Sequence, residues 1–128
     1  MIALTLPVKT ARLEALLPLL AGGKLTIYSG TQPAVGAAIT SQVALLEYDL
    51  ETPAGTVTDD ELTFAIPIPS AGIVTGTASW GRITDGYDVA LIDGDCGVFG
   101  SGALFILDSL SIASGVVITI LSIVLTEA

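Results

Sequence analysis

The sequence has no histidine and no asparagine, a single cysteine, and only 4 lysine and arginine residues among 128. Without histidine the chain lacks the commonest general base and the commonest metal ligand. Because Cys96 stands alone, neither an intrachain disulfide nor a thiolate zinc site can form, and we expect no metal and no cofactor. The net charge of −9 opposes contact with phosphate backbones, so nucleic acid is not an expected partner. The composition favours a structural or binding role, not an enzyme.

Apolar residues make up 52% of the sequence, whereas charged residues make up only 13%. Intrinsic disorder requires the opposite balance, and this length is typical of one domain with its own core. So few charges leave apolar surface that an assembly or another protein would cover. The most apolar run, residues 115–125, is too short for a membrane-spanning helix, which needs ~20 residues, and we expect no membrane contact.

Only residues 8–21 have the spacing of an amphipathic helix. Thr10 is the expected N-cap, Pro18 is expected to kink or end the helix, and Gly22-Gly23 is expected to terminate it. Four leucines at i, i+3, i+4 and i+7 form one apolar face, namely Leu13, Leu16, Leu17 and Leu20. Residues 1–22 are therefore expected to be an N-terminal arm and helix.

Residues 23–128 show the alternation and turn residues of short strands. This predicts a mainly β protein, an antiparallel, jelly-roll-like β-sandwich preceded by one short helix, in a single structural domain. The expected partner of strand 43–50 is 61–68, across an acidic loop, and Asp85-Gly86 predicts a type I′ hairpin turn. The last strand is apolar at odd and even positions, which predicts cover on both faces. The expected strands are residues 24–29, 43–50, 61–68, 76–84, 87–92, 103–107 and 116–125.

Several polar residues could belong to a functional site, but each also has a simpler structural explanation. The DGDCG sequence at 93–97 resembles a calcium loop superficially but lacks its other ligands, so a solvated turn is expected. The acids at 47–61 are expected to be an exposed acidic rim, not a catalytic pair. Cys96 is expected to be a small apolar filler in a turn, Trp80 a core anchor, and Arg82 a partner for a carboxylate.

Two consecutive stretches of this sequence carry a resemblance to a known group of proteins. Ala11–Leu17 (ARLEALL) leads into Gly22–Ala34 (GGKLTIYSGTQPA). This is similar to the short helix, Gly-Gly break and KLxIYxGxQPA element that open a group of small virion structural proteins of tailed bacteriophages and prophages. The similarity continues more loosely at residues 75–80, 85–86, 91–94 and 113–120, whereas the acidic Glu47–Glu61 region departs from the short polar connection of the family.

The resemblance implies a non-enzymatic virion component, a capsid decoration (cement) or minor capsid protein that braces the head lattice. Its partner would be the major capsid protein or another virion protein, and lattice symmetry favours a homotrimer. Its location would be the virion, assembled in the cytoplasm of the bacterial host. We expect either the helix face or the following corner to lie in the interface, which gives Leu13, Leu16, Leu17, Leu20, Tyr28, Gln32 and Pro33.

Other functions are open on the sequence alone. One is a tail, baseplate or fibre-associated β-sandwich protein. Another is a carbohydrate- or receptor-binding module that uses Trp80, Tyr28 or Tyr87. The third is a hydrolase that uses the acids of the 51–60 loop and its neighbours.

Overall fold

The structure, a computed structural model that describes residues 3–127, begins with two helical segments and continues as strands and loops. The helical segments are α1 (Leu6–Glu14) and α2 (Leu16–Leu20). The strands within these residues are β1 (Lys24–Ser29), β2 (Val43–Asp49), β3 (Gly55–Thr58), β4 (Glu61–Phe64), β5 (Ser70–Ala71), β6 (Gly76–Thr77), β7 (Trp80–Thr84), β8 (Ala90–Gly97), β9 (Phe105–Leu107), β10 (Ser111–Ile112), β11 (Val117–Ile118) and β12 (Ile120–Thr126).

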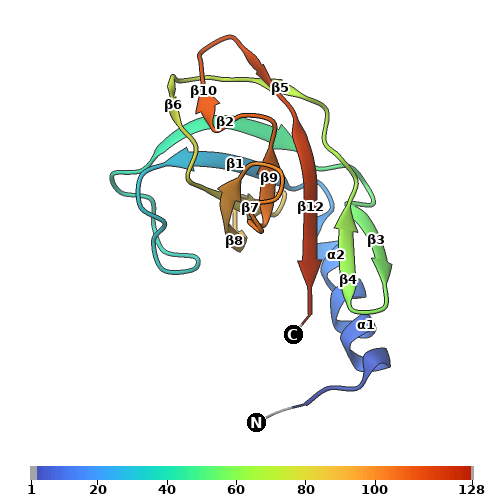
Figure 1. Cartoon of the computed structure of the whole chain (residues 1–128). Helices are drawn as coiled ribbons and strands as arrows, with labels where there is room; N and C mark the ends of the chain where they lie inside the picture. Colours follow the sequence, from blue (N-terminus) through green and yellow to red (C-terminus); the bar gives the residue numbers. More distant parts are fainter. Residues whose placement is uncertain (1–2, 128) are drawn as a thin grey trace.

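Eight strands form one curled sheet in the order β2-β1-β7-β8-β9-β12-β4-β3 (Figure 1). Neighbouring strands are antiparallel except β8 and β9. Two short ribbons, β10 with β6 and β11 with β5, lie at the end of the molecule away from the helices. The mainly β class with a short N-terminal helix is confirmed, and the two sides of the curled sheet face each other across the core in a sandwich-like manner.

The curl brings the β2 edge back towards the ribbon that precedes β12. The Leu45 carbonyl accepts hydrogen bonds from the Ile73 and Val74 amides at 2.7 and 3.4 Å, and Tyr48 Oη donates to the Ile118 carbonyl at 2.8 Å. The enclosed core is aliphatic with a few aromatic rings. Its largest fully buried members include Tyr48, Phe105, Leu13, Leu20, Leu25, Ile27, Leu45, Leu46, Leu62, Ile83 and Leu107.

The helix forms where the leucine spacing predicts it, with an earlier start and a break. It begins at Leu6, after Thr5, so Thr10 is inside α1 and not its N-cap; its Oγ donates to the Leu6 and Asp59 carbonyls. Pro18 has no N–H for the Glu14 carbonyl, which explains why α1 ends at Glu14 and α2 follows as a separate segment. The second segment ends before Gly22, whose φ of 72° suits glycine.

The predicted hairpin is present, with a wider turn than expected. Strands β7 and β8 pair from Trp80↔Asp95 to Thr84↔Ala90. The Asp85 carboxylate accepts hydrogen bonds from the Tyr87 and Val89 amides, at 2.8 and 3.0 Å. Those bonds close a loop over residues 85–89, with Asp88 at φ 64°, so the two-residue type I′ turn was wrong.

Three strand-level expectations are corrected. Strand β2 pairs with β1, while β4 pairs with β3 and β12; the expected 43–50 to 61–68 pairing was wrong. The 51–60 segment is not only a loop, because Gly55–Thr58 forms β3. Strand β12 has one face on the core and one exposed, since Leu121 and Val124 are 45% and 37% exposed, so the expected cover on both faces was wrong.

Candidate functional site

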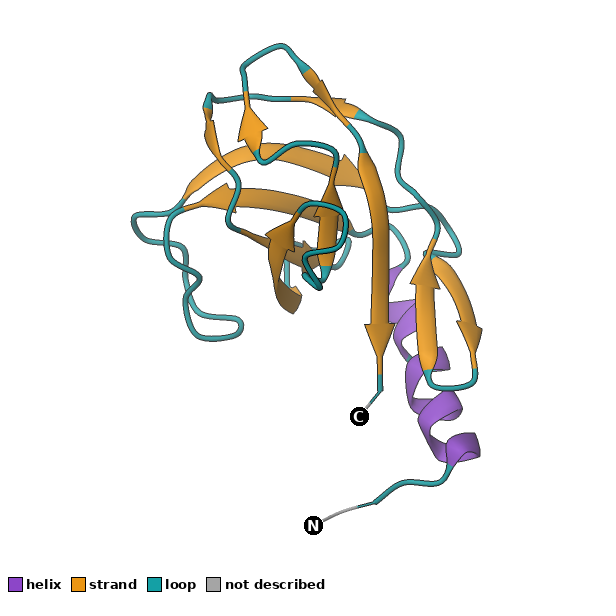
Figure 2. Cartoon of the chain, viewed as in Figure 1, coloured by secondary structure: helices purple, strands orange, loops and turns teal. Residues whose placement is uncertain are grey.

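The structure turns the leucine face of the helix towards this chain's own sheet. Leu13 and Leu20 are fully buried, and Leu16 and Leu17 are half-buried against the same core. The expected role of Leu13 and Leu20 in a partner interface is therefore corrected, because their side chains hold the helix to the sheet and do not reach the surface. Figure 2 shows the helix lying along the β3–β4 hairpin.

Tyr28, Gln32 and Pro33 lie at the corner between β1 and the 30–42 loop, as the sequence placed them. Gln32 is exposed, whereas Pro33 and Tyr28 are half-buried. The Ser79 hydroxyl donates to the Gly30 carbonyl at 2.5 Å and fixes this corner against the β6–β7 connection. Burial raises the pKa of the Tyr28 hydroxyl, against the lowering effect of Arg82. The corner stays a predicted contact point, with Gln32 as its freest side chain.

A buried ion pair lies next to this corner, between β7 and β8. Arg82 Nε and Nη2 donate to the two Asp93 carboxylate oxygens at 2.7 and 2.9 Å, which confirms that Arg82 pairs with a carboxylate. The Gly36 amide also donates to Asp93, at 3.1 Å, and so ties the 30–42 loop down. Burial alone would raise the pKa of Asp93, but these hydrogen bonds hold it below its ordinary value. The hydrogen bonds between Arg82 and Asp93 also raise the pKa of Arg82.

Trp80 is 0% exposed, as a core anchor should be, but it lies on the outer side of the sheet. Its strand neighbours Gly81 and Ile83 face the main core, so Trp80 and Arg82 face the opposite side. Tyr28 stacks on the Trp80 ring at 4.5 Å between centroids, and the Arg82 guanidinium lies 5.3 Å from that ring. Within residues 3–127, Trp80 Nε1 has no hydrogen-bond partner. The cluster fixes the loop to the sheet and leaves no room for a sugar to stack on Trp80.

The other acids that the sequence analysis considered lie in different elements of the described residues. Residues 93–97 are the end of β8 and not the expected turn; Asp95 accepts a hydrogen bond from the Leu104 amide at 3.0 Å. Asp59 and Asp60 form the β3–β4 turn, and Glu61 lies opposite Thr126. Among residues 3–127, no three His, Cys, Asp or Glu side chains are grouped to hold a metal ion.

Cys96 lies in β8, half-buried beside the core, so it is the expected small filler but not in a turn. Burial, together with Asp95, raises the pKa of its thiol from 9.0 to about 12.

We expect iodoacetamide at pH 8 to alkylate Cys96 at least ~100-fold more slowly in the folded protein than in urea, because the thiolate is the reactive form. The raised pKa of this thiol also makes the free energy of unfolding depend on pH. Its contribution should be constant up to about pH 9 and be lost as the pH rises towards 12. Equal alkylation rates in both states would refute this burial.

Exposed apolar side chains gather at the end of the molecule opposite the helices. The 71–74 and 114–117 segments are joined there, since the Gly72 amide donates to the Val116 carbonyl at 3.0 Å and Ser114 Oγ to the Ile73 carbonyl at 3.3 Å. We call this surface the apical patch, and it consists of Ile68, Ile73, Val74, Val116 and Val117, which are 77%, 56%, 40%, 53% and 57% exposed. This patch was not predicted from the sequence, although Pro67, Pro69, Gly72 and Gly115 flank its residues.

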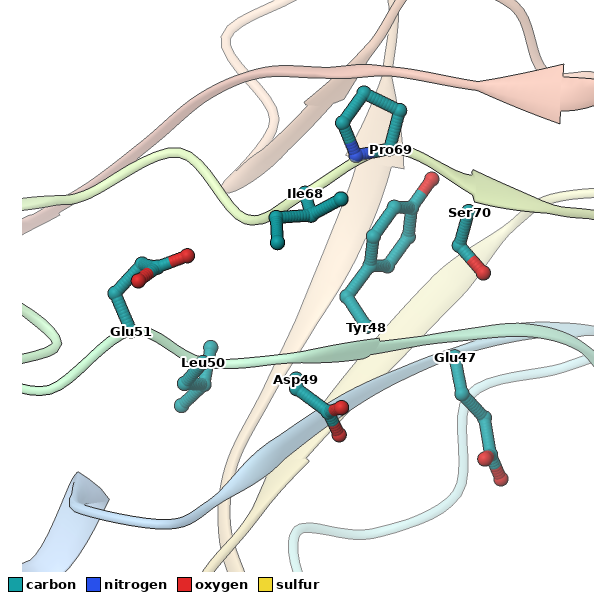
Figure 3. Close-up of a pocket in the computed structure, with 8 residues that line it drawn as sticks. All are labelled: Glu47, Tyr48, Asp49, Leu50, Glu51, Ile68, Pro69 and Ser70. Atoms are coloured by element: carbon teal, nitrogen blue, oxygen red, sulfur yellow. The ribbon is translucent and has the colours of Figure 1, made fainter.

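Two depressions are present on the surface of the described residues. One, of about 380 Å³, lies between the end of β2 and residues 68–70, with Tyr48 between its walls (Figure 3). The other, of about 520 Å³, lies between residues 18–22 and the 85–87 turn, beside Tyr87, which is 90% exposed. Neither helix in the described residues has the length and apolar character needed to cross a membrane.

No family model, curated protein or solved structure matches this chain. The resemblance to phage virion proteins therefore stays a prediction from the sequence.

Proposed function

We propose that this chain is a structural protein of a tailed-bacteriophage virion, most simply a capsid decoration or cement protein that braces the head lattice. The single observation that carries the proposal is the apical patch, five exposed apolar side chains at one end of a β protein. Exposed apolar side chains grouped at one end of a protein are typical of a surface that a partner covers. The GGKLTIYSGTQPA element supports the phage assignment.

The proposed contact is between the apical patch and the major capsid protein, with three copies around a symmetry axis of the shell. Binding only to the assembled shell would stabilise it by mass action, because each bound copy shifts the equilibrium away from disassembly. The helix would then play a role within the chain, since Leu13 and Leu20 belong to its own core. A minor capsid protein would use the same contact at lower copy number.

The test is binding to heads produced without this chain. We expect wild-type protein to sediment with such heads, and Ile73→Ser combined with Val117→Ser to lose at least about tenfold in affinity, because two apolar contacts are removed. Leu19→Ser is the matched control, as Leu19 is 53% exposed on the helix at the other end. A loss confined to Leu19→Ser would instead place the interface on the helix, and no binding by the wild-type protein would overturn the cement role.

A second candidate is a carbohydrate- or receptor-binding module, favoured by Tyr87 beside its depression and not by the buried Trp80. An exposed ring next to an open hollow is the arrangement that stacks on a sugar face. Glycan-array binding that is lost in Tyr87→Ala would support this candidate. A tail, baseplate or fibre location is separated from the head by the copy-number measurement described at the end of the Discussion.

A further inference from the structure

The outer edge of β2 has backbone groups without partners. The Leu50 amide donates to the Gly23 carbonyl at 3.0 Å, so even-numbered residues at this end of β2 direct their backbone groups to β1. The odd-numbered Glu47 and Asp49 therefore direct theirs to the opposite side. Further up, that side is occupied, because the Leu45 carbonyl accepts from Ile73 and Val74. In the part of the chain that the structure describes, no backbone hydrogen bond reaches the outward groups of Glu47 and Asp49.

The neighbouring segment stays apart from this edge for a chemical reason. Residues 66–69 read Ile-Pro-Ile-Pro, and the two prolines have no N–H to donate to β2. The segment pairs with β11 only from Ser70 onward. What remains is the cleft of about 380 Å³, with the Tyr48 ring between β2 and Pro69 (Figure 3). A sheet edge next to an open cleft is where an extended segment adds as a further strand.

The charged side chains along this edge favour a binding segment of opposite charge. Glu47, Asp49 and Glu51 alternate along one side of the strand and are exposed. Across β1, Asp49 has Lys24 opposite it, whereas Glu47 has only Thr26. An added strand would place its own alternate side chains beside these acids, and opposite charges in that position are favourable. Two β2 edges from two copies would bring like charges together, which disfavours self-pairing.

This chain cannot supply the complementary segment. Of its 4 basic residues, Lys9 and Arg12 lie in α1, Lys24 in β1, and Arg82 in the buried ion pair. None is on a free extended stretch. These residues do not supply a complementary segment, and the proposed occupant is a segment of another protein.

We propose that the outer edge of β2, from Glu47 to Glu51, binds an extended basic segment of another protein as an added strand. The segment has Lys or Arg at alternate positions, beside the acids, and apolar residues between them that face Ile68 and Pro69 on the opposite wall of the cleft. Its backbone exchanges hydrogen bonds with Glu47 and Asp49. The inference does not depend on the virion assignment, and because Ile68 belongs to both surfaces, the test leaves it unchanged.

The test uses the full chain and a fluorescent octapeptide of alternating lysine and valine. We expect saturable binding and slower hydrogen exchange of the Glu47 and Asp49 amides when the peptide is bound. Glu47→Gln with Asp49→Asn should weaken binding about tenfold. The control, Glu14→Gln with Asp88→Asn, removes the same charge from exposed positions elsewhere and should leave affinity within about twofold.

A second peptide separates strand addition from simple attraction to an acidic protein. It has the same sequence with alternate backbone nitrogens methylated, which removes N–H donors while keeping every charge. Strand addition predicts a loss of binding and of amide protection with this peptide. Equal affinity for both peptides, or an equal effect of both charge variants, would overturn the proposal. So would dimerisation of the Glu47→Gln, Asp49→Asn protein without peptide binding, since the acids would then serve to keep copies apart.

Discussion

Replacing Arg82 with alanine is expected to lower the free energy of unfolding by about 3–5 kcal/mol, because the Asp93 carboxylate would stay buried without its charge partner. The two side chains are 7% and 1% exposed and meet at 2.7 Å. Arg12 provides the matched control. Its 3.2 Å pair with Glu127 leaves the arginine side chain 57% exposed, so Arg12→Ala should cost less than about 1 kcal/mol. Urea unfolding of the three proteins measures both effects.

The pH dependence follows from the same pair. The pKa of Asp93 is below its ordinary value of 3.8, so the stabilisation is present above about pH 4 and is lost as pH falls through the folded pKa. Asp93→Asn should remove this loss of unfolding free energy below about pH 4, because Arg82 stays charged throughout this range. Replacing both residues, Arg82→Met with Asp93→Leu, should recover much of the loss, because no unpaired charge remains. Similar losses for Arg82→Ala and Arg12→Ala would contradict a buried pair.

Truncating Leu20 to alanine is expected to destabilise the protein by about 2–5 kcal/mol, through the lost burial and the cavity that remains. Leu20 is 0% exposed in the core, while its neighbour Leu19 is 53% exposed. Leu19→Ala should therefore change the free energy of unfolding by no more than about 0.5 kcal/mol. Thermal unfolding of both variants tests whether the helix packs on its own sheet. A helix that docked only on a partner would give small changes in both.

The helix and several strands could be predicted because their signals are local. The spacing of Leu13 and Leu20 defines the face that the sheet buries, and Pro18 marks the break before α2. Alternation in Lys24–Ser29 gives β1 with its bounds unchanged. The burial of Trp80 and the pairing of Arg82 followed from the general cost of exposing a large ring or isolating a charge.

The wrong predictions share a different cause, which is contact between residues far apart in the sequence. Asp93-Gly94 has the composition of a turn, yet Arg82 pairs with the carboxylate and Leu104 packs against Gly94, where a side chain would collide. Those contacts override the local turn preference. The partner of β2 was likewise misassigned, because nothing local distinguishes β1 from β4 as its neighbour.

The two proposed contact surfaces could not be predicted from the sequence, because each is formed by residues that are far apart in it. The apical patch joins residues near Ile73 to residues near Val116, which the ribbons bring together. The β2 edge became visible only when the backbone bond of Leu50 fixed which side of Glu47 is unpaired. Sequence alone showed an acidic stretch and a pair of prolines, without the cleft between them.

The measurement that tests the proposed virion role most directly is the copy number of this chain in purified virions, relative to the major capsid protein. Quantitative peptide mass spectrometry supplies the ratio. A cement role predicts a ratio near one or a simple fraction set by the lattice. A handful of copies would move the protein to the tail or neck, and its absence from the particle would contradict the virion proposal.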